Sequence, residues 1–163
     1  MTPVTRIGTG PRMSEAVIHN GIVWLSGQVG NPGDDVTAQT RTCLAEVDRI
    51  LALAGTDKTR ILSAQVWLAD AGTVAQMNAV WDAWVPPGNA PPRATGESKL
   101  VAPDYLVEVI VVAALPFWVA VLIVLTAMIG FSFGLERVVL RPLLGRPIVA
   151  VIMATGGSTN AVL

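Results

Sequence analysis

The chain has 163 residues and a formal net charge of −1. Such a balanced charge leaves no broad basic field to gather nucleic acid or anionic lipid, so we expect no nucleic-acid partner. The hydrophobic fraction is 52%, and it is concentrated at one end, because only four charged side chains lie beyond residue 114 whereas nineteen lie before it. Composition therefore divides the chain into a domain of residues 1–114 and a hydrophobic segment of residues 115–163.

Cys43 is the only cysteine of the chain. An internal disulfide is excluded, and a lone cysteine is consistent with a reducing compartment. Because Cys43 falls within a helical pattern, we favour a buried packing role over a reactive thiol. The first residues contain no apolar signal-peptide core, so we expect residues 1–114 to fold in the cytoplasm.

The first regular elements are predicted in residues 16–29, AVIHNGIVWLSGQV. Two β-rich runs flank Asn20-Gly21, and this dipeptide is typical of a type I′ hairpin turn, in which both central residues need a positive φ. His19 is accordingly interpreted as a strand-end residue. No metal site is expected around it, since no Cys, Asp or Glu cluster at ligand spacing accompanies it.

A helix is predicted next, over the apolar stripe that runs from Val36 to Ala54 at spacings of three, four and seven. Asp34-Asp35 places acidic groups where a helix start favours them, and Gly55 is the expected C-terminal stop. Residues 61–68, ILSAQVWL, have the composition of a strand.

A second helix is predicted over about residues 72–85, with one apolar face that we interpret as core: Met77, Val80, Trp81 and Trp84. Residues 86–92, PPGNAPP, form a rigid loop that delivers Arg93 to the next strand, because proline lacks a donor and restricts φ. Strands are then predicted in ATGESKL and LVEVIVVAA. Two helices on one sheet face indicate an α+β fold, and an oligomer would cover the other, apolar face.

No charged residue lies between Glu108 and Glu136. With residues 109–114 assigned to the last strand, residues 115–135 have about the length needed to cross ~30 Å of hydrocarbon. Phe117 and Trp118 lie where an interfacial aromatic belt would be. We therefore predict a transmembrane-type helix and inner-membrane association through residues 115–135, with a helix buried in a soluble core as the alternative.

Several stretches together span the first 114 residues: Ser26-Gly27-Gln28, TRTCLAEVDRILALAG, WLAD, MNAVWDAW, PPRAT around Arg93 and LVEV around Glu108. Through them the domain resembles a complete member of the RidA family (YjgF/YER057c/UK114), in one of its RidA-like subgroups. The resemblance implies a chorismate-mutase-like six-stranded sheet with two helices on one face. It also implies a homotrimer with active sites in the clefts between subunits.

Residues 115–163 resemble something unrelated. FGLERVVLRPLLGRP followed by VIMATGG is similar to an internal piece of a LivH-type permease of branched-chain amino-acid ABC transporters. Such permeases need many spans to surround a pathway, so this fragment cannot transport by itself. We interpret the chain as a fusion, genomic or introduced during sequence assembly, and keep a permease fragment as an alternative function.

RidA-type enzymes hydrolyse reactive 2-imino and 2-enamino acids to 2-oxo acids and ammonia, and the resemblance implies this activity here. Arg93 matches the family's carboxylate-binding arginine, because a guanidinium holds a carboxylate by two parallel hydrogen bonds. A surface arginine paired with Glu97 or Asp104 is the alternative. Glu108 matches the water-positioning glutamate, and burial in an apolar strand would raise its pKa toward neutrality. The alternative for Glu108 is an ion pair between subunits.

Ser26, followed by Gly27, matches a serine that borders the family pocket, where it would hydrogen-bond substrate or water. A plain turn serine is the alternative. The pocket tyrosine of the archetype falls at Met13 and its cysteine at Thr95, and a methionine cannot donate the phenol's hydrogen bond. No nucleotide loop or metal set occurs, so no cofactor is expected. The sequence thus predicts an imine/enamine deaminase, with a non-catalytic module that binds small carboxylates as the alternative.

Overall fold

The computed structural model describes residues 3–137. Contacts along the chain divide it into two units, Met1–Val119 and Ala120–Leu163. The permease-like stretch of residues 133–147 lies mostly outside the described residues, and VIMATGG (151–157) lies entirely outside them.

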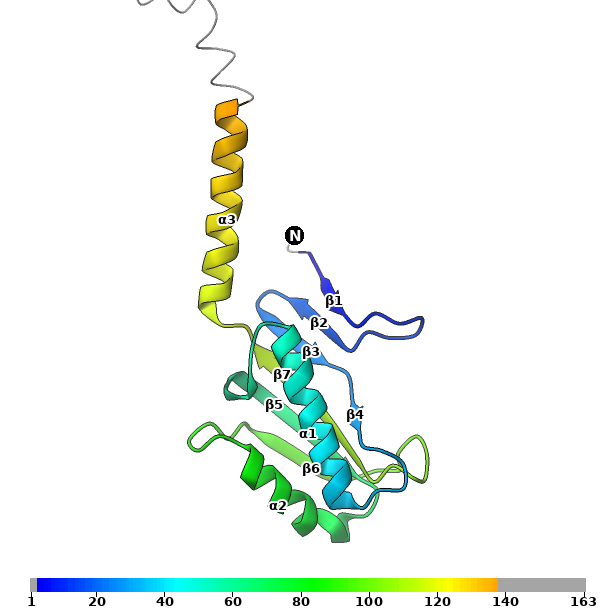
Figure 1. Ribbon diagram of the computed structural model, residues 1–163. Helices are drawn as coiled ribbons and strands as arrows, with labels where there is room; N and C mark the ends of the chain where they lie inside the picture. Colours follow the sequence, from blue (N-terminus) through cyan, green and yellow to red (C-terminus); the bar gives the residue numbers. More distant parts are fainter. Residues whose placement is uncertain (1–2, 138–163) are drawn as a thin grey trace, which may run out of the picture. The chain divides into compact units, whose positions relative to one another are not determined.

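The first unit is built on one mixed sheet with helices on one face. Its elements, in chain order, are β1 (Thr5–Ile7), β2 (Ala16–His19), β3 (Ile22–Leu25), β4 (Gln28–Val29), α1 (Val36–Leu53), β5 (Ile61–Leu68), α2 (Val74–Trp84), β6 (Arg93–Glu97) and β7 (Val107–Ala114). Strands follow the order β1-β2-β3-β7-β5-β6, with β4 also paired to β7. Among the strands in the described residues, only β5 and β6 pair in parallel. Helices α1 and α2 lie beside each other on the same face (Figure 1), so the predicted α+β architecture is confirmed.

The sheet has seven strands rather than the six expected. A further strand, β1, lies before residue 16, where the first regular element was predicted, and its Thr5 pairs with Ile18 of β2. The two residues of β4 pair with β7, placing Val29 opposite Glu108. Both strands are too short to show a period of two, and they exist because a partner strand supplies their hydrogen bonds.

The predicted hairpin and first helix are confirmed in detail. Asn20 and Gly21 both have positive φ, 49° and 76°, and His19 pairs with Ile22 across the two-residue turn. The Asp35 carboxylate caps α1 by accepting from the Ala38 N–H at 2.7 Å. At the other end Gly55 has φ 80°, and its N–H donates to the Ala52 carbonyl at 3.0 Å.

Strand β7 has one face in the core and one face turned away from it. Its buried positions are Val107, Val109, Val111 and Ala113, and its half-buried positions are Glu108, Ile110, Val112 and Ala114. The core face packs on α1 and belongs to the same buried cluster as Met77 and Trp81 of α2, which are buried as predicted. Cys43 is also buried, in agreement with its expected packing role.

Helix α3 (Phe117–Leu135) begins two residues later than the segment predicted to cross a membrane. Leu115 still belongs to the sheet end, since its N–H donates to the Gly21 carbonyl at 2.8 Å. The helix therefore has 19 residues instead of 21. Within residues 3–137, no helix meets the length and apolarity required of a membrane span. The transmembrane-type helix and membrane association through residues 115–135 are accordingly not supported.

Candidate functional site

Glu108 projects from the face of β7 that does not pack on the helices. Its neighbours across the ladder are Val29 of β4 and Trp67 of β5. Its carboxylate occupies the space beside Gly27, because a Cβ built on Gly27 would lie 1.8 Å from Glu108 Oε1 and 2.8 Å from its Cδ. Only a residue without a side chain allows the carboxylate to lie there. The position of the Glu108 carboxylate therefore depends on a glycine at position 27.

Ser26 is held in a local hydrogen-bond network. Its hydroxyl donates to the Glu15 carbonyl at 3.1 Å and accepts from Gln28 Nε2 at 3.0 Å. The backbone N–H of Ser26 also donates to the Glu15 carbonyl, at 2.9 Å. The hydroxyl proton is therefore used within the chain, and Ser26 retains acceptor capacity only. The network ties the turn carrying Gly27 to the segment before β2.

Arg93 is the first residue of β6, and its side chain lies against α2. Nη2 donates to Asn78 Oδ1 at 2.7 Å, and the guanidinium carbon lies 4.7 Å from the centroid of the Trp81 ring. Burial lowers the pKa of Arg93, an effect that the nearby Asp82 partly opposes. The ion pairs formed among residues 3–137 do not involve Arg93, so the alternative pairing with Glu97 or Asp104 does not occur there.

Within one chain, Arg93 and Glu108 lie on opposite faces of the sheet. Arg93 pairs with Ala64, which pairs with Val111, and both neighbours are buried in the core. Glu108 is three residues from Val111, so the alternation of side chains along a strand turns it to the other face. A single chain therefore does not bring the two side chains together.

The remaining predicted site residues divide between these two places. Thr95 is two residues beyond Arg93 on β6 and is exposed. Met13 is 59% exposed and lies in the connection between β1 and β2. That connection leads to Glu15, whose carbonyl holds Ser26. In the chain, Met13 is therefore close to Glu15, and Thr95 is close to Arg93.

Two residues that position the site were missed in the sequence. The buried Gln39 amide donates to the Asp104 carbonyl at 2.8 Å, and Gln39 Oε1 accepts from the Leu106 N–H at 2.8 Å. These bonds hold the segment that leads into β7 and so help to place Glu108. Asn78 contacts Arg93 directly. The only signal for Asn78 was a polar residue next to the apolar stripe of MNAVWDAW.

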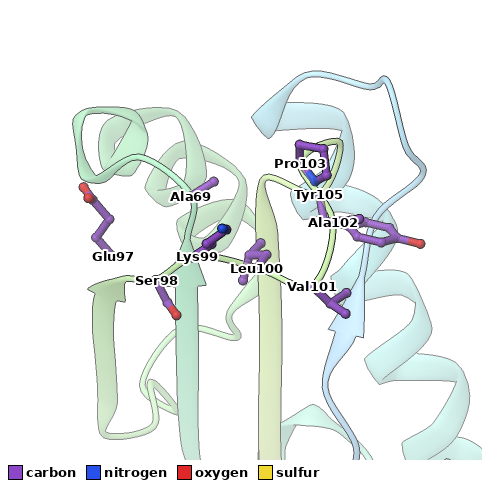
Figure 2. Close-up of a pocket in the computed structure, with 9 residues that line it drawn as sticks. All are labelled: Ala69, Glu97, Ser98, Lys99, Leu100, Val101, Ala102, Pro103 and Tyr105. Atoms are coloured by element: carbon purple, nitrogen blue, oxygen red, sulfur yellow. The ribbon is translucent and has the colours of Figure 1, made fainter.

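A hollow of about 630 Å³ lies at the end of β5 and β6, lined by Ala69, residues 97–103 and Tyr105. Figure 2 shows Glu97 and Tyr105 at opposite ends of this hollow, with the loop between β6 and β7 arching between them. Neither Arg93 nor Glu108 lines it. The hollow is therefore separate from both halves of the candidate site.

No group of three or more His, Cys, Asp or Glu side chains within residues 3–137 is arranged to hold a metal ion. The thiol of Cys43 is a poor nucleophile at neutral pH, because burial raises its pKa to about 12 and keeps it protonated. The ionisable side chains predicted for the site are the Arg93 guanidinium and the Glu108 carboxylate.

Comparison with known proteins places these residues in a family context. The family model described as Endoribonuclease L-PSP matches residues 5–115. A RutC family protein of Haemophilus ducreyi is 45% identical over 113 residues, covering 69% of this chain and 97% of that protein. RutC family protein YoaB of Escherichia coli K12 is 41% identical over 111 residues, covering 68% and 97%.

Solved structures agree with this similarity. The crystal structure of NMB1025, a YjgF family member from Neisseria meningitidis, has a TM-score of 0.69 and 43% identity, covering 71% of this chain and 97% of its own. A Salmonella typhimurium protein described as a putative translation initiation inhibitor has a TM-score of 0.65 and 40% identity, covering 71% and 100%. None of these matches supports the permease resemblance of residues 115–163.

Proposed function

Because the chain belongs to the RidA family, which includes the YjgF and RutC proteins, we propose that it hydrolyses 2-imino and 2-enamino acids to 2-oxo acids and ammonia. One observation carries the proposal: Arg93 presents a half-buried guanidinium, stacked on Trp81, that pairs with no carboxylate in the described part of the chain. A cation held in this way is suited to the carboxylate of a small acid.

In the proposed reaction, Arg93 binds the substrate carboxylate and thereby orients the imine carbon. Glu108 hydrogen-bonds a water and accepts its proton as the oxygen attacks that carbon. The same carboxyl group returns that proton to nitrogen, which gives a carbinolamine. It then carries the hydroxyl proton to the amino group, so that ammonia leaves as the carbonyl forms. The balance is one imino acid and one water to one 2-oxo acid and one ammonia, with no redox step or external cofactor.

The proposed site is completed between copies of the chain, in a homotrimer. Two features support this assembly. Arg93 with Thr95, and Glu108 with Gly27, lie on opposite sheet faces, so one chain supplies only half of the chemistry to a given cleft. The face carrying Glu108 also carries apolar side chains that water would otherwise contact, including Trp24 at 40% exposure and the half-buried Ile110 and Val112.

Ammonia release from an imine generated by an amino-acid oxidase tests the proposal. The full chain should accelerate release above the spontaneous rate, and Arg93→Ala should abolish that acceleration. Arg60→Ala, which changes an exposed arginine outside the site, is the matched control and should behave as wild type. Binding of a 2-oxo acid without turnover would refute the proposed activity and favour the module that only binds small carboxylates. Light scattering would check the trimer.

A further inference from the structure

Three side chains from two consecutive turns of α2 contact the guanidinium of Arg93. Nη2 donates to Asn78 Oδ1 at 2.7 Å, and Nη1 lies 3.8 Å from Met77 Sδ. The guanidinium lies over the Trp81 ring, with 4.7 Å from the guanidinium carbon to the ring centroid. Trp81 itself is only 5% exposed and leans on Trp84 at 5.4 Å between centroids. The support is therefore rigid, because its aromatic base is part of the core.

This arrangement restrains the guanidinium but leaves some of its N–H groups available for another acceptor. A guanidinium carries five N–H groups, and the contacts with Asn78 and Met77 use one on each terminal nitrogen. The Nε–H and one N–H on each terminal nitrogen remain for another acceptor. Because the guanidinium lies over the Trp81 ring and Nη2 is hydrogen-bonded to Asn78, rotation of the guanidinium is restrained, and this restraint favours one direction for the free N–H groups.

We propose that Asn78 and Trp81 are positioning residues for the substrate carboxylate, acting through Arg93; this inference rests on the proposed function. The amide oxygen of Asn78 is a neutral acceptor, so it orients the guanidinium while leaving its positive charge for the substrate. A carboxylate at the same place would be nearly the same size but would neutralise that charge. An amide at position 78 therefore leaves the charge of Arg93 available to bind the substrate carboxylate, whereas an acid would not.

Asn78→Asp separates this role from a merely structural one. The aspartate keeps the hydrogen bond and the shape, so the fold should be retained, but it competes with the substrate for Arg93. We expect KM for the imine, and Kd for 2-oxobutanoate measured by calorimetry, to rise about tenfold or more, with kcat changed far less. Gln76→Glu adds the same charge at an exposed position of α2 and should leave both constants unchanged.

Asn78→Ala provides a second variant that does not depend on the added charge. It removes the hydrogen bond that restrains rotation, and we expect Kd for 2-oxobutanoate to rise by about threefold to tenfold. Both variants should keep the thermal unfolding midpoint of wild type within a few degrees, and the alanine variant decides the matter if the aspartate variant does not fold.

The two proposals fail in different ways. If wild type turns over the imine and both folded variants keep wild-type KM and Kd, the positioning role is wrong and the deaminase proposal stands. If wild type binds 2-oxobutanoate without releasing ammonia from imines, and Asn78→Asp weakens that binding, the activity is wrong and the positioning role stands.

Discussion

Gly27→Ala tests whether the position of the Glu108 carboxylate determines activity. A Cβ on Gly27 would lie 1.8 Å from Glu108 Oε1, whereas ordinary contact begins at 3.4 Å. The difference requires the carboxylate oxygen to move by about 1.6 Å. Glu108 is a flexible side chain on the sheet face away from the core, so it can take another rotamer at a cost of about 1 kcal/mol or less in the free energy of unfolding.

The catalytic effect should be much larger than the structural one. A displacement of about 1 Å in a catalytic group is enough to lower a rate by about 10²-fold. We therefore expect kcat for imine hydrolysis to fall by about two orders of magnitude in Gly27→Ala, with a thermal unfolding midpoint close to that of wild type. Ammonia release and circular dichroism on the same preparation measure the two quantities.

Gly30→Ala is the matched control, because it adds the same methyl group three residues away. There the new Cβ would lie 2.5 Å from Gln39 Cα and 2.4 Å from Gln39 Cβ, in the buried start of α1. The Gln39 backbone cannot move out of the way by changing rotamer, as the Glu108 side chain can. We therefore expect a loss of about 1–3 kcal/mol in the free energy of unfolding. If Gly27→Ala keeps wild-type kcat with an intact fold, the position of the Glu108 carboxylate beside Gly27 does not affect catalysis. The argument that links this position to activity is then refuted.

Three further outcomes are expected. Glu108→Gln keeps the size of the side chain but removes its base, so ammonia release should fall by about 10²-fold or more while Kd for 2-oxobutanoate changes little; wild-type turnover would contradict the role of Glu108. Burial raises the pKa of Cys43 from 9.0 to about 12, so its contribution to stability is complete below pH 9 and is lost as the pH rises toward 12. Alkaline denaturation should therefore be shallower above pH 9 in Cys43→Ala than in wild type, and an equally steep curve would argue against the burial effect. Asp35→Ala removes the cap on the Ala38 N–H and should cost about 1 kcal/mol in urea denaturation, whereas Asp34→Ala, beside it, is the comparison that should cost less.

Local chemistry was sufficient to predict several elements from the sequence. The type I′ turn follows from Asn20-Gly21, since few other pairs accept two consecutive positive φ values. The limits of α1 follow from Asp35 and Gly55, which act on backbone groups within one helical turn. In each case the residues that decide the structure are neighbours in the chain, so the sequence displays them together.

The pairing of distant segments was decided only by the tertiary structure. Strand β1 carries no pattern of its own, and the predicted run of residues 22–29 is divided into β3 and β4. The place of Leu115 at the end of the sheet depends on its bond to the Gly21 carbonyl, 94 positions away, so the sequence assigned Leu115 to the membrane-type helix instead. Such contacts depend on which strands meet and in what register, and composition does not encode either quantity locally.

The candidate site shows the same division. Arg93, Glu108 and Gly27 were predicted as site residues from the family resemblance, but the sequence did not show that the first two lie on opposite sheet faces or that Gly27 makes room for a carboxylate. Residue types determine which chemistry is available, because charge and hydrogen-bonding capacity belong to each side chain. Where that chemistry is directed depends on strand register and on the helix packed beside each strand, and these arise only when the whole domain has folded.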